Sequence, residues 1–378
     1  MKIAMVAGEA SGDLLGAGLI RAIRERVPGA VFEGVAGPEM IEAGCARLED
    51  AETLAVMGLI EPLREIPRLL RLRRSLIQRW RDSPPDVFVG IDAPDFNFGL
   101  EKKLRRSGIR TVHYVSPSIW AWRAGRINTV REAADRVLCI LPFEKPIYDE
   151  NGVDAVFIGH PKADTIPSFV DVESARQLLG LDEGQVVAVL PGSRDSEVSR
   201  LGPLFAAASA RLARRDERLN FVTPAATPKL RAMIEAQLEQ AGVAERFTIT
   251  DGGSIDAMAA ADVVLLASGT AALEAALLGK PTVAAYRVAA LTALLVRLLG
   301  LLKLEYFTIP NLLTETPLVP EFIQEAATPE ALAEAVAALL ADPDRRLAIT
   351  RRFDELRSTL ALGADARAAR AVLEIANQ

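Results

Sequence analysis

The sequence predicts an α/β protein of two Rossmann-like domains, and three observations lead to this fold class. Short apolar runs alternate with stretches of helical character along most of the chain, which is typical of parallel α/β sheets. A segment rich in proline and polar residues, 159–174, separates two such series of similar size. The chain has 378 residues, 50% of them apolar, which is enough to build two cores.

Each predicted strand is a short run of adjacent apolar residues, as in strands that are buried on both faces. In the first series we expect strands at KIAMVA (2–7), AVFEGV (30–35), DVFVGID (86–92), RTVHYV (110–115), RVLCIL (136–141) and DAVFIG (154–159). In the second series we expect them at QVVAVLP (185–191), LNFVTP (219–224), RFTITD (246–251), DVVLLA (262–267) and TVAAYR (282–287). Helical stretches such as 14–27 and 100–108 lie between them.

Composition excludes several classes of function. The net charge of −6 gives no overall signature of nucleic-acid binding. Two cysteines in so long a chain argue for a reducing compartment, and two histidines exclude a histidine-rich metal centre. The apolar part of the N-terminus is too short for a signal peptide. The longest apolar run, 288–302, is interrupted by Arg297 and is shorter than a membrane-spanning helix. These features predict a cytosolic chain of the soluble type.

A glycine-bearing turn follows the first apolar run of the second series. In LPGSRDSEV the backbone amides of Gly192 and Ser193 are expected at a helix start, and Arg194 adds a permanent cation. Such amides and an arginine together make a cradle for a phosphate. An ordinary Pro-Gly turn with a surface arginine is the alternative, and this turn alone does not exclude it.

A second helix start on the same half carries the segment SGTAALE. The apolar run ends at Ser268, a helix-capping residue, and Gly269 and Thr270 follow, where a ligand can approach the backbone closely. We expect these amides to hold a pyrophosphate, while Glu274 accepts hydrogen bonds from ribose hydroxyls. The alternative for Glu274 is a surface carboxylate, which its alanine and leucine neighbours disfavour.

The first half offers carboxylates at a strand end. Asp92 ends the run VGID, and a carboxylate at the carboxyl end of a strand, facing a cleft between two domains, can act as a general base. A structural role is nearly as well supported for Asp92. Asp95 follows a proline, where a helix cap is the stronger interpretation.

Two further segments of the first half reach the same rim. GEASGD (8–13) brings Glu9, Ser11 and Asp13 there, with helix capping as the alternative for Ser11 or Asp13. HYVSPSIWAWRAGR (113–126) follows another strand. Its aromatic faces suit a sugar or acyl chain and its arginine a phosphate; core tryptophans and a solvated arginine are the alternative. The residues concerned are His113, Trp120, Trp122 and Arg123.

Nine motifs together resemble the lipid-A-disaccharide synthase family over roughly residues 1–345. They are GEASGD, VAGPEM, VMGLIE, VGIDAPDFN, HYVSPSIWAWR, LPFEK, LPGSR, LLASGTAALE and IPNLL. The resemblance implies the glycosyltransferase B (GT-B) architecture with an interdomain cleft. It implies an N-terminal acceptor and lipid domain (1–165), a UDP-sugar domain (166–345), and C-terminal helices (346–378) that pack back onto the N-terminal domain.

The resemblance also implies the reaction. A diacylated glucosamine is moved from UDP to the 6-hydroxyl of 2,3-diacylglucosamine 1-phosphate, giving the β-linked disaccharide of lipid A and UDP, with no metal or cofactor. In the family the counterpart of Asp92 is a candidate base and the counterpart of Arg194 is required. Inversion at the anomeric carbon needs such a base, with Glu9 and His113 as the alternatives. Asn311, Glu321 and Gln324 lie downstream and line the donor sugar in this interpretation, with loop and cap polarity as the alternative.

A basic segment, 61–81, carries seven arginines against two glutamates, interleaved with leucine, isoleucine and tryptophan. We expect Arg71, Arg73 and Arg74 to hold the enzyme on the cytoplasmic face of the anionic inner membrane, beside its lipid substrates. A solvated basic helix packed on the core is the alternative. A monomer and a homodimer both remain compatible with the sequence, and no nucleic acid is expected as a partner.

Two rival functions fit the predicted fold. One is another GT-B-type enzyme acting on a soluble sugar, such as a UDP-N-acetylglucosamine 2-epimerase. Release of free UDP with a lipid acceptor would separate it from the synthase. The other is a non-catalytic sensor of nucleotide sugars at the membrane, which loss of Asp92 would leave functional.

Overall fold

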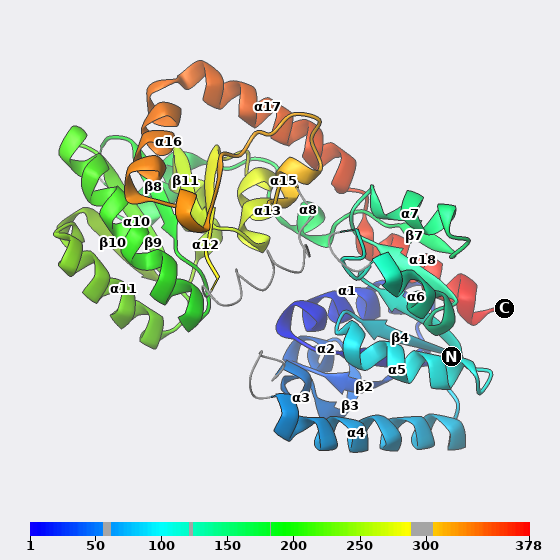
Figure 1. Ribbon diagram of the computed structural model, residues 1–378. Helices are drawn as coiled ribbons and strands as arrows, with labels where there is room; N and C mark the ends of the chain where they lie inside the picture. The colour runs from blue at the N-terminus through cyan, green and yellow to red at the C-terminus, as the bar shows by residue number, and fades with distance from the viewer. Residues whose placement is uncertain (56–61, 121–123, 182, 289–304) are drawn as a thin grey trace. The chain divides into compact units, whose positions relative to one another are not determined.

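The computed structural model describes residues 1–55, 62–120, 124–181, 183–288 and 305–378 (Figure 1). The chain forms two compact units. The first comprises Met1–Asp164 together with Leu360–Gln378, and the second comprises Thr165–Thr359. The sequence placed the first boundary one residue later, between 165 and 166. Most of the apolar run 288–302 lies outside the described residues.

The first unit is built on a seven-stranded parallel sheet of order β3-β2-β1-β4-β5-β6-β7. Its strands are β1 (Lys2–Ala7), β2 (Val31–Ala36), β3 (Cys45–Asp50), β4 (Val87–Ile91), β5 (Arg110–Tyr114), β6 (Arg136–Cys139) and β7 (Ala155–Phe157). Its helices are α1 (Ala10–Arg26), α2 (Pro38–Glu42), α3 (Glu52–Ala55), α4 (Pro62–Asp82), α5 (Pro94–Arg105), η1 (Ala124–Arg126), α6 (Ile127–Ala133), α7 (Glu144–Glu150), α8 (Pro161–Thr165) and α18 (Ala364–Ala376).

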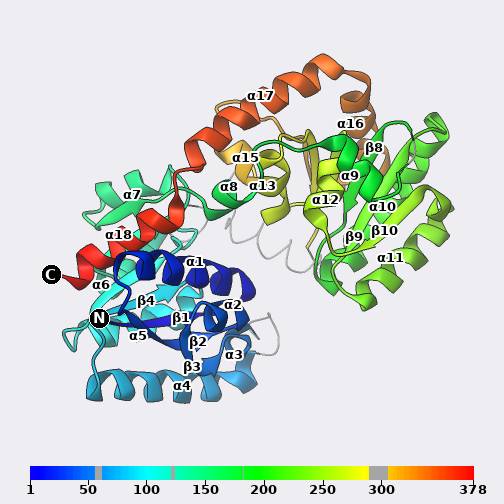
Figure 2. The ribbon, with the colours of Figure 1, turned by 180° about the vertical axis from the view of Figure 1, so that it is seen from behind.

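Side chains of β1 show how this sheet is covered on both faces. Ile3 and Met5 pack into a core with α1 and α18, whereas Ala4 and Val6 face the opposite core, built with α4 and α5. Successive residues of a strand point to opposite faces, so a strand covered on both sides is apolar throughout. In the second core Trp80 of α4 is fully buried. Figure 2 shows α1 and α18 side by side.

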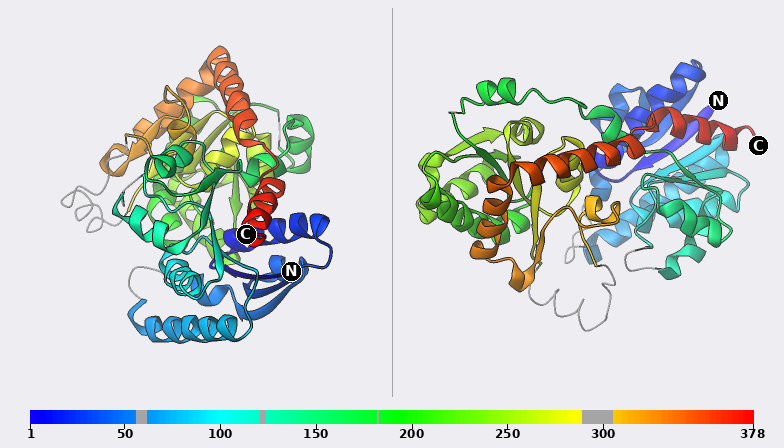
Figure 3. Two further views of the ribbon diagram at one scale, coloured as in Figure 1. Left: turned by 90° about the vertical axis from the view of Figure 1, so that its right-hand side faces the viewer. Right: turned by 90° about the horizontal axis from the view of Figure 1, so that it is seen from above.

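The second unit contains a six-stranded parallel sheet of order β10-β9-β8-β11-β12-β13 (Figure 3). Its strands are β8 (Val186–Leu190), β9 (Asn220–Ala225), β10 (Phe247–Asp251), β11 (Val263–Ala267), β12 (Thr282–Tyr286) and β13 (Glu321–Ile323). Its helices are α9 (Val172–Leu178), α10 (Asp195–Arg215), α11 (Pro228–Ala241), η2 (Ala244–Arg246), α12 (Ser254–Ala260), α13 (Thr270–Leu277), α15 (Ile309–Leu312), η3 (Gln324–Ala326), α16 (Pro329–Ala341) and α17 (Pro343–Leu360).

The C-terminal segment divides between the units, whereas the sequence assigned all of 346–378 to the N-terminal domain. Helix α17 belongs to the second unit, where Thr350 donates a 2.7 Å hydrogen bond to the carbonyl of Gly279. Helix α18 belongs to the first unit and packs on α1 through small buried side chains such as Ala368 and Ala369. Within the described residues, no helix is both long enough and apolar enough to cross a membrane.

Candidate active site

The predicted turns lie at the switch point of each sheet, where the strand order reverses and ligands bind in doubly wound folds. In the first unit this point lies between β1 and β4, whose last residues Ala7 and Ile91 are register partners. GEASGD follows β1 and Asp92 follows β4, so the two segments leave the sheet as neighbours. In the second unit it lies between β8 and β11, which lead into LPGSR and SGTAALE.

The turn after β4 holds Asp92 in an unusual backbone conformation. Asp92 (φ 50°) and Ala93 (φ 42°) are both left-handed. This conformation costs a non-glycine residue on the order of 1–3 kcal/mol, so surrounding contacts must enforce it. Asn97, fully buried in α5, supplies them, because its Nδ2 donates to the carbonyls of Asp92 (2.8 Å), Val6 (3.3 Å) and Ile91 (3.4 Å). Asp92 is half-buried, and no side-chain hydrogen bond of its own is found in the described part of the chain.

The neighbouring turn, GEASGD, packs directly on this one. A Cβ on Gly8 would lie 2.5 Å from the Cβ of Ala93, so only glycine fits. Glu9 is exposed at the N-cap of α1 without a capping side-chain bond, and Ser11 is exposed in its first turn. Asp13 is buried, and its carboxylate accepts the amides of Gly37, Glu39 and Met40 at 2.8–3.1 Å. Asp13 therefore caps α2 and not α1, the helix that follows β1, so its role is structural but is not the cap expected from the sequence.

His113 belongs to the interior of the first unit. Its Nδ1 lies 2.7 Å from Oε1 of Glu101, both side chains are fully buried, and its ring contacts Phe98 at 4.5 Å between centroids. A proton acceptor must come within hydrogen-bond reach of the substrate. Of the three candidate bases, Glu9 is exposed, Asp92 is half-buried and His113 is enclosed.

Asp95 and Arg73 form part of the scaffold around α5. Asp95 lies in the first turn of α5, where its side chain pairs with Arg126 and its carbonyl accepts Nη2 of Arg73 at 3.0 Å. The guanidinium of Arg73 lies over the ring of Phe96, 4.9 Å from its centroid, and burial lowers its pKa. The prediction that Arg73 faces a membrane is thus not supported by its contacts, whereas Arg71 and Arg74 are exposed.

Only part of HYVSPSIWAWR is described. Trp120 packs edge-on against Phe143, with ring centroids 5.1 Å apart and planes at 83°. Trp122 and Arg123 lie outside the described residues. Beside this segment Glu144 of the LPFEK motif is buried, and its Oε2 accepts the amide of Leu141 at 3.0 Å. Burial raises the pKa of Glu144 to about 7.

In the second unit the LPGSR turn is closed by a residue that the sequence analysis did not single out. The carboxylate of Glu197, in the first turn of α10, accepts the amide of Ser193 at Oε2 (3.0 Å) and Nη1 of Arg194 at Oε1 (3.3 Å). Gly192 has φ 129°, and a Cβ there would lie 2.5 Å from the Cβ of Glu197. The N-cap of α10 is Arg194 rather than a serine, threonine, aspartate or asparagine, so the capping-box pattern does not mark Glu197 in the sequence.

The SGTAALE segment differs from expectation at its first residue. The amide of Ser268 donates to the carbonyl of Ala285 (2.9 Å) and extends the β11–β12 pairing, so it is not available to a pyrophosphate. Gly269 is the N-cap of α13, and Gly269 and Thr270 are exposed. Glu274 is half-buried one turn further along α13.

The three polar residues assigned to the donor sugar hold the chain around β13. Asn311 is buried and bonds Glu321 and the backbone of Leu318 and Val319. Glu321 also accepts the amides of Phe307 (2.7 Å) and Thr308 (3.0 Å). Gln324 accepts the amide of Val288 at 3.1 Å. These contacts correspond to the alternative interpretation, loop polarity.

Two parallel sheets with polar, glycine-bearing turns at both switch points are the architecture of GT-B glycosyltransferases. The calicheamicin glycosyltransferase CalG4 has a similar fold, with a TM-score of 0.62 at 18% identity over 100% of this chain and 98% of that one. WaaG, a glycosyltransferase involved in lipopolysaccharide biosynthesis, gives 0.59 at 13%, covering 98% of this chain and 99% of WaaG. UDP-GlcNAc 2-epimerase from Neisseria meningitidis gives 0.60 at 14%, covering 99% of both chains. At these identities the likeness concerns the fold alone.

Sequence similarity identifies the family within this class. Residues 3–375 match the lipid-A-disaccharide synthetase family. The lipid-A-disaccharide synthase of Alkalilimnicola ehrlichii is 50% identical over 379 residues, covering 100% of this chain and 99% of the relative. That of Pseudomonas putida strain W619 is 50% identical over 373 residues, covering 99% and 98%. The chain belongs to the lipid-A-disaccharide synthase family, whose members are glycosyltransferases of lipid A biosynthesis.

Proposed function

We propose that this enzyme condenses UDP-2,3-diacylglucosamine with 2,3-diacylglucosamine 1-phosphate, releasing UDP and the lipid A disaccharide 1-phosphate. Family membership supports the reaction. The observation that carries the site assignment is the pair of switch points, one presenting Asp92 and the other presenting Arg194. An epimerase role rests on structures of 12–14% identity, whereas the relatives at 50% identity are named as synthases.

The second unit supplies the donor site in this proposal. Arg194 and the amides of the LPGSR turn hold the diphosphate, together with the exposed amides of Gly269 and Thr270 at the start of α13. Helix N-termini carry partial positive charge, which stabilises the diphosphate as it departs. Glu274 accepts hydrogen bonds from the ribose. Asn311, Glu321 and Gln324 act indirectly, by fixing the chain around β13.

The first unit supplies the base. Forming a β-linkage from an α-linked donor inverts the anomeric carbon, so one direct displacement is sufficient. The acceptor 6-hydroxyl attacks C1, its proton passes to a carboxylate oxygen of Asp92, and the C1–O bond to UDP breaks with both electrons leaving on the diphosphate. The left-handed turn and the Asn97 amide fix the backbone from which the Asp92 side chain extends.

The test is turnover of the two lipid substrates, with the disaccharide product measured by mass spectrometry. Asp92→Asn keeps the size of the side chain but cannot accept the proton, so turnover should fall about 10²–10⁴-fold. UDP affinity should stay near that of the wild type. The matched control is Asp86→Asn at the opposite end of β4, where Oδ2 accepts the amide of Lys2 at 2.6 Å. Near-normal turnover of Asp92→Asn would reject the base assignment and transfer the role to Glu9 or His113, whereas a wild-type protein without turnover would favour the non-catalytic sensor.

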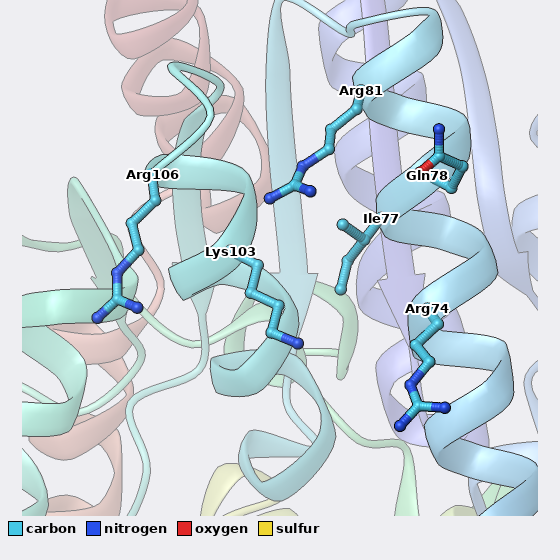
Figure 4. Close-up of a pocket in the computed structure, with 6 residues that line it drawn as sticks. All are labelled: Arg74, Ile77, Gln78, Arg81, Lys103 and Arg106. Carbon is cyan, nitrogen blue, oxygen red and sulfur yellow. The ribbon is translucent and has the colours of Figure 1, made fainter.

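We further propose peripheral attachment to an anionic membrane through α4. A recess of about 420 Å³ between α4 and the end of α5 is lined by four cationic side chains, with no carboxylate among its lining residues (Figure 4). They are Arg74, Arg81, Lys103 and Arg106. Ile66 and Leu70 are exposed at 41% and 40%, and they precede Arg74 at intervals of four residues, on the same face of α4. Near an anionic leaflet each cation contributes about 1 kcal/mol.

The attachment is tested by co-sedimentation with vesicles of phosphatidylglycerol and phosphatidylcholine. Arg74→Glu/Lys103→Glu should weaken binding strongly, and binding of the wild type should fall as salt rises. The control, Arg345→Glu/Arg351→Glu, makes the same change of charge on exposed positions of α17. Equal binding by the two double variants would reject the recess as the attachment site.

A further inference from the structure

The carboxylate of Glu197 occupies the turn that the proposed function assigns to the donor diphosphate. Its two oxygens accept hydrogen bonds from the amide of Ser193 (3.0 Å) and the guanidinium of Arg194 (3.3 Å). It also lies directly over Gly192, since a Cβ on that glycine would be 2.6 Å from Oε2. A negatively charged group of the protein therefore uses the same donors, and the same space, as the proposed ligand.

Part of this arrangement is ordinary helix capping. Glu197 stands three residues after Arg194, the N-cap of α10, where a glutamate commonly reaches back to the amide of the N-cap residue. Here it accepts the amide of Ser193, one residue earlier. Capping explains why a side chain with an acceptor oxygen is present. It does not require a negative charge, because a glutamine would cap equally well.

We propose that Glu197 is an internal competitor for the donor diphosphate, which must leave the amide of Ser193 before the diphosphate can bind there. The inference rests on the proposed function, since it concerns the same turn. Two anions cannot share one N–H donor, and at short range they repel each other. A diphosphate, with several charges and oxygens, displaces the carboxylate, whereas a weakly charged anion does not. Glu197 thus selects for diphosphate ligands and lowers the affinity for all of them.

The decisive variant is Glu197→Gln, which keeps an acceptor for the amide of Ser193 but removes the charge. Hydrogen bonds to an ionised group are about twice as strong as neutral ones, so the competitor is weakened. We expect the Kd for UDP, measured by calorimetry, to fall about ten-fold, equivalent to about 1.4 kcal/mol. The Kd for uridine, which has no phosphate, should not change.

Two controls separate this effect from others. Asp195→Asn removes a charge from the same first turn, where Asp195 pairs with Lys229 rather than with the LPGSR turn, and it should change the Kd for UDP less than two-fold. Glu197→Ala removes the competitor and the cap together. It should tighten UDP as well, with a lower unfolding temperature than Glu197→Gln.

Unchanged or weaker UDP binding by Glu197→Gln would overturn the inference, because it would make the residue a cap or a ligand-holding group. An equal gain for uridine, or for Asp195→Asn, would overturn it too, because the effect would not be specific to the phosphate or to the position. A wild-type enzyme that binds no UDP would instead reject the proposed donor site, so the two failures are distinguishable.

Discussion

Replacing Asn97 by alanine should destabilise the first unit and reduce turnover while leaving the donor site intact. The amide of Asn97 is fully buried and joins the ends of β1 and β4 through the carbonyls of Val6, Ile91 and Asp92. The methyl group of alanine has no hydrogen-bond donor and cannot replace these contacts. The turn that carries Asp92 would then be free to leave its left-handed conformation.

The magnitude follows from the geometry. The 2.8 Å bond to Asp92 has ordinary length, and the bonds to Val6 (3.3 Å) and Ile91 (3.4 Å) are longer and weaker. The bond to Asp92 contributes about 1 kcal/mol net, and the bonds to Val6 and Ile91 together contribute about as much. Leaving the Asp92 carbonyl without a partner costs about 1–2 kcal/mol more, which gives a loss of about 3–4 kcal/mol in the free energy of unfolding.

Denaturant unfolding followed by tryptophan fluorescence is the assay, because Trp80, Trp120 and Trp122 are the protein's three tryptophans and all precede Thr165, where the second unit begins. The control is Asn128→Ala at an exposed position of α6, where the side chain accepts a hydrogen bond from Nη1 of Arg131 at 2.7 Å and the change should stay within about 0.5 kcal/mol. Turnover of the Asn97 variant should fall while its UDP affinity stays unchanged. A loss of stability no larger than that of the control, or turnover equal to that of the wild type, would refute the reasoning.

Three further results are expected. Burial raises the pKa of Glu144 from 4.5 to about 7, so this group contributes stability below pH 4.5 that is lost as pH rises through 7. The free energy of unfolding should therefore fall by about 3 kcal/mol over this range, measured by unfolding at several pH values, and Glu144→Gln should remove this dependence on pH. Burial lowers the pKa of His160 from 6.5 to about 4, so stability falls as pH drops from 6.5 through 4, and His160→Gln should abolish that loss in the same measurement. Gly8→Ala should lower the unfolding free energy by about 1–3 kcal/mol through overlap with Ala93, and an unchanged melting temperature would show that the turn relaxes without cost.

The sequence was a good guide to the fold, and its failures there have local causes. The α/β class with two parallel sheets is confirmed, and each of the eleven predicted strands corresponds to a strand of the structure. Strands β3 and β13 were missed. CARLED, the sequence of β3, has charged residues at an edge of the sheet, and β13 has only three residues at the edge of the other. Neither shows the apolar run that marks a central strand.

The site was predictable to the level of turns but not of atoms. A turn is encoded locally, by glycine and polar residues after an apolar run, so both switch points could be located. The use of each polar atom depends on residues elsewhere in the chain. The amide of Ser268 is taken by Ala285 of β12, Arg73 lies on Phe96 of α5, and His113 of β5 is paired with Glu101. These pairings come from tertiary packing, which no local pattern shows.

The candidate carboxylates of the site fall into two groups, according to the hydrogen bonds that their oxygens already accept. Asp13 accepts three backbone amides at the start of α2, and Glu321 accepts the amides of Phe307 and Thr308. A carboxylate held in this way must break hydrogen bonds before it can take a proton, and a buried amide left without its acceptor adds a cost of about 1–3 kcal/mol. Such groups are therefore poor bases. Asp92 makes no side-chain hydrogen bond within the described residues, yet its backbone is held in a strained turn by Asn97. A carboxylate whose backbone is fixed and whose oxygens are uncommitted meets the requirement for a general base.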